Sequence, residues 1–134
     1  MRDRPAPEEL LKGARAVLDR DIAPSLEGQR RFAAILVSRA MGVAGRAIAN
    51  GDAPLRAEAR RLAALLDHRL AAELAPEALS VALMDLNRLV ADRIRKGGFD
   101  AGADRQRVFD HLRQVTRDKL AESNPRYFEQ GKAG

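Results

Sequence analysis

The chain has 134 residues, no cysteine, two histidines and a formal net charge of +5, and its length is that of one ordinary domain. The lack of cysteine excludes disulfides, thiolate metal sites and cysteine nucleophiles, and two histidines are too few for a histidine-rich metal site, so we expect no metal and no cofactor. Leucine and alanine are abundant, whereas β-branched and aromatic residues are few. This mixture favours helices and predicts an all-α protein.

Three of the five excess positive charges come from residues 25–50, where four arginines accompany the single acid Glu27. Elsewhere acids and bases alternate at helical spacing, which is typical of a solvated helix surface. Because no basic cluster stands out, we expect no nucleic-acid partner. Uncharged runs reach only seven residues, and the N-terminal residues lack the apolar region of a secretory signal. We therefore expect a cytoplasmic protein with no membrane partner.

Prolines, glycines and apolar periodicity divide the chain into five predicted helices. Their expected ranges are 7–23, 25–50, 53 to a point between 67 and 75, 76–96, and a last helix that starts after Asp100 or Asp104 and ends before Pro125. The second helix is apolar on most sides, which predicts that it is central and mostly buried. Inside it, Gly42 and Gly45 each cost about 0.5–1 kcal/mol relative to alanine, so we expect close helix packing there to compensate.

Together these elements predict a single five-helix bundle over residues 1–125 with a long, mostly buried second helix, followed by a polar C-terminal tail over 126–134. We expect a homodimer if the second helix keeps one apolar side uncovered. His111 lies on the polar side of the fifth helix, exposed or at a helix contact, and Asp118 is too distant along the helix to assist it. Because no nucleophile has a base beside it, we expect no enzyme activity.

Two polar residues lie at the margins of apolar stripes and leave alternatives open. Asn87 either makes a hydrogen bond that fixes the register of the bundle or contacts a ligand. Arg46 either pairs with an acid of another helix or lines a groove that receives an anion. Arg56, Arg60 and Arg61 form either a local basic patch or an ordinary solvated face.

A series of short motifs also follows a distinctive order and spacing. The motifs are Arg4-Pro5, Glu9-Leu10-Leu11, Pro24-Ser25-Leu26-Glu27-Gly28, Arg31-Phe32, Asn87-Arg88, Ile94-Arg95-Lys96-Gly97, His111-Leu112-Arg113, Lys119-Leu120 and Asn124-Pro125-Arg126-Tyr127. In this order they resemble a small bacterial helical domain family of unknown function. The resemblance extends from about Arg4 to Tyr127, and it departs from the family pattern at Arg39, where Asn is usual, and at Ala47, where an acid is usual.

The family is associated with kinases that resemble aminoglycoside phosphotransferases and with gene neighbourhoods that contain acyl-CoA dehydrogenases. The resemblance therefore implies an accessory role near a phosphotransferase-like partner and supplies no catalytic residue. The chain itself has no kinase motif, so we expect a helical interaction module. The alternative is a binding module for an acidic small molecule, such as an acyl-CoA or a nucleotide. The candidate binding residues are Arg31, Arg46, Asn87 and Arg88, and the three arginines are expected to rim the groove.

Overall fold

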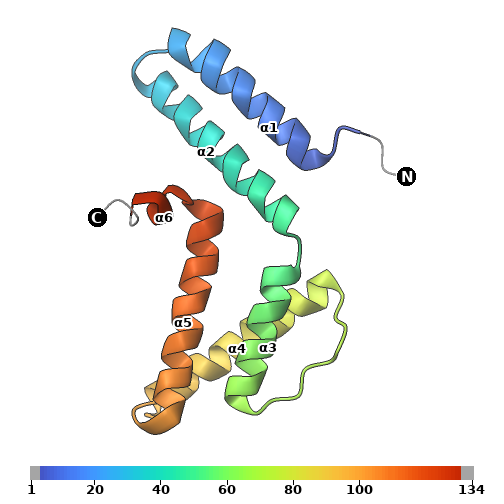
Figure 1. Ribbon diagram of the computed structural model, residues 1–134, viewed down its shortest axis with the longest axis vertical. Helices are drawn as coiled ribbons and strands as arrows, with labels where there is room; N and C mark the ends of the chain where they lie inside the picture. Colours follow the sequence, from blue (N-terminus) through green and yellow to red (C-terminus); the bar gives the residue numbers. More distant parts are fainter. Residues whose placement is uncertain (1–3, 131–134) are drawn as a thin grey trace. The chain divides into compact units, whose positions relative to one another are not determined.

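The computed structural model describes residues 4–130, and this part of the chain is helical without a strand (Figure 1). It divides into two compact units, one up to Gly51 and one from Asp52 onward. The elements are α1 Pro7–Val17, a π-helical turn Leu18–Ile22, a 3-10 turn Ala23–Ser25, α2 Gly28–Asn50, α3 Ala53–Leu66, α4 Pro76–Arg95, α5 Gly102–Ser123 and α6 Arg126–Gln130.

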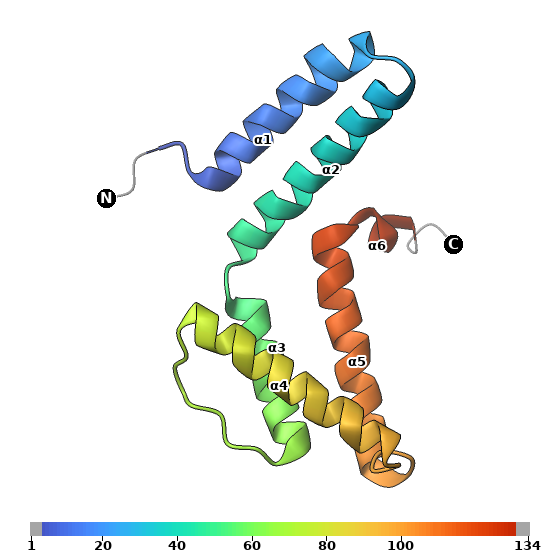
Figure 2. The same cartoon turned by 180° about the vertical axis from the view of Figure 1, so that it is seen from behind.

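The first unit is a hairpin of two antiparallel helices, α1 and α2 (Figures 1 and 2). The start of α1 is stabilised by Glu9, whose carboxylate accepts a hydrogen bond of 2.9 Å from the backbone N–H of Ala6. Gly51 ends α2 with a φ of +56°, a conformation that glycine adopts without steric cost. The predicted glycine stop at this position is confirmed.

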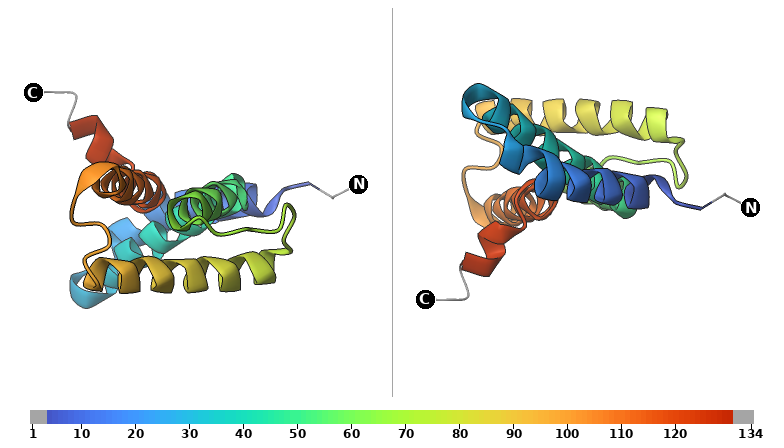
Figure 3. Two further views of the ribbon diagram at one scale, coloured as in Figure 1. Left: turned by 90° about the horizontal axis from the view of Figure 1, so that it is seen from below. Right: turned by 90° about the horizontal axis from the view of Figure 1, so that it is seen from above.

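In the second unit, α3 and α4 start at the same end and cross each other, while α5 runs back along α3 (Figures 1 and 2). The guanidinium of Arg61 contacts Asp118 and that of Arg107 contacts the carbonyl of Ala64, which fixes the antiparallel register of α3 and α5. Because α3 and α4 start at the same end, the connection over residues 67–75 must return along the unit (Figure 3). Nine extended residues reach about 30 Å, enough to retrace a helix of 14 residues, which is about 21 Å long.

The core of the second unit lies between α3 and α4 and is closed by α5. Leu62 and Leu79 are its most deeply buried large side chains. The other buried members are Ala59, Leu65, Leu83, Leu86, Val90, Phe99 and Val108. The buried residues of α4 recur at helical spacing, whereas Ile94, one turn after the last of them, is 41% exposed.

The all-α prediction is confirmed, but the number of helices, the N-cap residue of α5 and the burial of the second helix differ from the prediction. Six α-helices lie between Arg4 and Gln130 instead of five, because Arg126–Gln130 forms α6 where a polar tail was expected; positions 131–134 of that tail lie outside the described residues. The N-cap residue of α5 is Ala101, which makes no side-chain cap hydrogen bond, so neither Asp100 nor Asp104 holds that position. The prediction that residues 1–125 form one bundle domain stays a prediction, since each unit is described by itself.

The prediction of a mostly buried second helix is wrong. Among the 23 residues of α2, only Ala34 and Ser38 are buried. The physical reason is that an apolar surface on most sides of a helix needs several neighbouring helices to cover it, and within its unit α2 packs on α1 alone.

Truncating a core side chain of the second unit should lower its free energy of unfolding far more than truncating a surface side chain. Leu62→Ala removes a fully buried side chain and is expected to lower the free energy of unfolding by about 2–5 kcal/mol. Leu89→Ala, at a position that is 49% exposed, is the control and should cost less than about 1 kcal/mol. Urea unfolding followed by circular dichroism measures both, and similar losses would contradict this description of the core.

Candidate functional site

The α1–α2 hairpin exposes a continuous apolar surface on one side. The two helices contact each other at Leu11, Arg15, Ser38 and Gly45. In an antiparallel pair of helices, the residues that come directly before such contact positions lie on the same side of the pair. We define the hairpin face by the large side chains of this surface, with Ala14 and Ala44 between them: Leu10, Val17, Val37 and Ile48. These four are 57%, 46%, 47% and 46% exposed. The surface is contiguous over both helices, and such patches commonly mark contact sites.

α2 carries further exposed apolar side chains outside the hairpin face, with Phe32 at 62% and Leu36 at 47%. By length and composition alone α2 would also qualify as a membrane-crossing helix, a test that the core helices of soluble proteins pass as well. Arg39 and Arg46 lie within its apolar stretch. Each arginine at the centre of a membrane helix costs about 2.5–3.5 kcal/mol, which weighs against that placement.

The hairpin also holds a groove of about 540 Å³, which charged side chains line together with Leu11, Met41 and two glycines. The Nε of Arg15 donates to the hydroxyl of buried Ser38 at 3.1 Å and lies 3.5 Å from the carboxylate of Asp19. Its Nη1 crosses α2 at Gly42, only 2.7 Å from the place where a Cβ of that residue would be. The glycine therefore leaves space for a guanidinium, whereas close packing of helix backbones was expected.

A cluster of polar side chains joins α3 to α5 in the second unit. His111 is 5% exposed, so the sequence-based alternative of a helix contact holds and the exposed one does not. Beside it, the guanidinium of Arg61 pairs with Asp118 at 3.2 Å, and Asp118 also accepts a 2.8 Å bond from Gln114. Two buried polar atoms, Nε of Arg61 and Nδ1 of His111, have no hydrogen-bond partner within the described residues.

Burial lowers the pKa of His111, and the charge of Arg61 lowers it further, while Glu58 acts in the opposite direction. The imidazole is therefore neutral in the folded protein at neutral pH. Helical periodicity left the burial of His111 open; the apolar Phe109 and Leu112 of the same helix are 49% and 46% exposed. A buried histidine next to an arginine has a structural role unless a substrate reaches it. His111 lines neither the groove of the hairpin nor the cavity described in the next paragraph.

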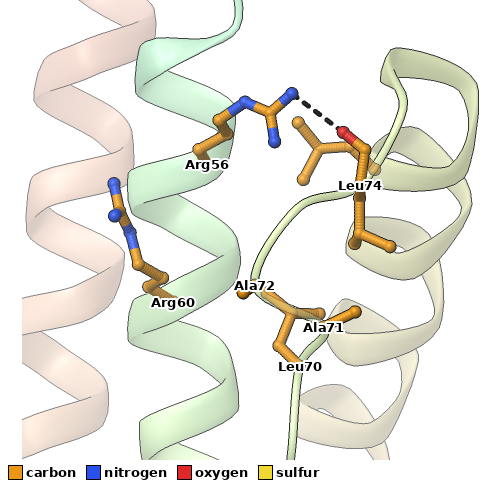
Figure 4. Close-up of a pocket in the computed structure, with 7 residues that line it drawn as sticks. Arg56, Arg60, Leu70, Ala71, Ala72 and Leu74 are labelled. Carbon is orange, nitrogen blue, oxygen red and sulfur yellow. Dashed lines mark hydrogen bonds between the residues drawn. The ribbon is translucent and has the colours of Figure 1, made fainter.

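The connection over residues 67–75 encloses a cavity of about 210 Å³ against α3 (Figure 4). Arg56 closes it by donating a 2.8 Å hydrogen bond to the carbonyl oxygen of Leu74. Arg60 also lines the cavity, but its side chain extends along α3 on the side away from the connection (Figure 4). Because Arg61 turns to Asp118, the three arginines do not gather into one basic patch.

The predicted binding residues fall into both units. Arg31 and Arg46 are on α2, 15 residues and therefore about 22 Å apart along the helix, and only Arg46 lines the groove. Arg88 is exposed on α4 and pairs with Asp85 at 3.5 Å. Neither unit by itself holds all three arginines of the predicted groove.

Asn87 is exposed and not buried, and its amide donates to the carbonyl of Leu83 and, at 3.3 Å, to the carboxylate of Glu58 on α3. The bond to Leu83 lies within α4, whereas the bond to Glu58 links α4 to α3, as in the structural alternative for this residue. Between Arg4 and Gln130, no three His, Asp or Glu side chains are grouped so as to hold a metal ion.

Lowering the pH should destabilise the second unit through His111. The unfolded chain binds this proton with an ordinary pKa near 6.5, whereas the folded protein resists it, so the free energy of unfolding falls as the pH drops below about 6.5. Urea titrations between about pH 8 and pH 5 measure the slope. His111→Leu should reduce it, and the control His68→Leu, at an exposed position, should retain it. Equal slopes in wild type and His111→Leu would refute this role.

Removing the Arg56 bond should release the connection over residues 67–75. Arg56→Met loses a charge-assisted bond worth about 1.5–3 kcal/mol and is expected to speed thermolysin cleavage at Leu70 or Leu74. Arg60→Met is the control, because Arg60 lines the same cavity while its side chain extends away from the connection. Mass spectrometry of the fragments locates the cuts, and equal cleavage rates in the two variants would contradict the anchoring role of Arg56.

Residues 24–127, most of the chain, match a family model described as domain of unknown function DUF6285. No curated protein and no solved structure matches the chain. The match includes all of α2, α3, α4 and α5, so the family pattern extends over parts of both units. The resemblance to a helical family of unknown function is confirmed to this extent, and the chain belongs to the DUF6285 family of domains of unknown function.

Proposed function

We propose that the protein is an accessory interaction module that docks through the hairpin face onto a phosphotransferase-like protein. The proposal rests on one observation: the first unit buries few residues and exposes large apolar side chains. From Arg4 to Gly51 only Ala34 and Ser38 are buried, while the large side chains of the hairpin face remain about half exposed.

The free energy available at this surface is considerable. Full burial of a large aliphatic side chain contributes about 1.5–3 kcal/mol, so covering the exposed halves of Leu10, Val17, Val37 and Ile48 would contribute on the order of 3–6 kcal/mol before the costs of association. A partner would also contact α2, whose net positive charge favours an acidic rim on the other protein.

The choice of partner rests on the resemblance, which associates the family with phosphotransferase-like kinases. A module without catalytic groups of its own would act by binding and regulating such an enzyme. This proposal includes a cytoplasmic location, no enzymatic activity of the chain and no membrane or nucleic-acid partner. The homodimer that we conditionally expected competes for the same surface, because α2 does keep an apolar side uncovered.

A charge placed on the hairpin face should abolish the complex. Val37→Glu introduces a carboxylate into the apolar surface and is expected to weaken binding at least tenfold, because burying an unpaired charge costs several kcal/mol. Gln29→Glu adds the same charge at an exposed position of α2 outside the face and should bind normally.

The measurement is size-exclusion chromatography with light scattering, applied to the protein alone and mixed with the phosphotransferase-like protein encoded beside it. A defined complex that Val37→Glu disrupts supports the proposal. A stable dimer of the protein alone that Val37→Glu dissociates assigns the face to a second copy and overturns it, as does a failure of the two folded proteins to associate.

A further inference from the structure

The groove of the hairpin presents two guanidinium groups to one place. Nη1 of Arg15 and Nη1 of Arg46 lie 2.7 Å and 3.4 Å from the position that a Cβ at Gly42 would occupy. One group comes from α1 and the other from α2, so the helix register brings them together. Guanidinium groups donate well to carboxylates and phosphates, so an anion placed between these two would contact both.

Arg15 is held in this orientation by the rest of its guanidinium. Nε is engaged by buried Ser38 and lies near Asp19, which leaves the Nη groups directed over Gly42. A guanidinium fixed in this way loses little freedom when it binds a carboxylate or a phosphate. Gly42 leaves room for this orientation, because a Cβ at this position would require the guanidinium of Arg15 to move.

Gly45 has a different part in the groove. A Cβ there would meet only the Cβ of Leu11, at the ordinary contact distance of 3.9 Å. The packing of α1 on α2 therefore does not require a glycine at this position. Its lack of a side chain widens the groove beside Leu11 and Met41, which supply apolar walls.

The volume of about 540 Å³ lies within the range of small-molecule sites. We propose that this groove binds the oxyanion of a small amphipathic molecule, with a carboxylate or phosphate head between Arg15 and Arg46 and an apolar chain against Leu11 and Met41. Lys12 lines the same groove and adds positive charge, whereas Glu8 and Glu9 line it as carboxylates that compete with the ligand. The side chains that line the groove are different from the four large ones that define the hairpin face, so the proposal does not depend on the proposed docking.

The test is a nitrogen-edited NMR titration of the full chain with octanoate and, separately, with octyl phosphate. The backbone amides of Gly42 and Gly45 report directly on the groove, and saturable shifts of both are the expected result. The head group that gives the lower Kd identifies the source of the oxyanion. Octanol, which has the same chain and no charge, should not bind comparably.

Two variants and one matched control complete the experiment. Arg46→Gln is expected to raise the Kd about tenfold or more, and Gly42→Ala should weaken binding while retaining helicity, since alanine favours a helix but displaces Arg15. Arg39→Gln removes the same charge from α2 at an exposed position outside the groove and should leave the Kd unchanged. No saturable shift by either anion below about 1 mM, equal binding of octanol, or equal weakening by Arg39→Gln would overturn the proposal.

Discussion

A hairpin of two helices cannot bury its own apolar side chains, and this constraint governs the first unit. Each helix packs mainly on the other, so only the residues near the line of contact are shielded, and on α2 these include the small or polar Ala34, Ser38, Gly42 and Gly45. The large side chains stay on the outer surfaces. The hairpin therefore has an apolar face and a groove lined by charged side chains, and the proposed partner and the proposed anion concern different side chains.

The second unit meets the same constraint differently. Three helices enclose Leu62 and Leu79, and the return of the chain over residues 67–75 is secured by the bond from Arg56 to Leu74. The polar cluster at His111 lies within this enclosed region, and its ion pair between Arg61 and Asp118 joins α3 to α5. Stability is thus expected to concentrate in this unit, with pH dependence supplied by one buried imidazole.

Apolar periodicity and helix-breaking residues predicted the helical class, the ends of α2 and α4 and most of the core of the second unit. These features are predictable because proline, glycine and apolar spacing determine the conformation of the chain locally. The failures concern contacts between distant elements. Helical spacing could identify α2 as apolar but not count the helices that cover it, and it left the burial of His111 undecided, because that depends on how α5 packs on α3. Arg46 was selected as a groove residue, but its companion Arg15 was not, since only the antiparallel register brings both over Gly42.

The central claim is that the hairpin face is completed from outside, and hydrogen exchange read by mass spectrometry tests it most directly. In the protein alone, the amides of α1 and α2 should exchange much faster than those of α3 and α4, because the hairpin lacks an enclosed core. Adding the phosphotransferase-like protein should slow exchange over residues 37–48 and leave α4 unchanged. Exchange in α2 that is as slow as in α4 in the monomeric protein would contradict the account.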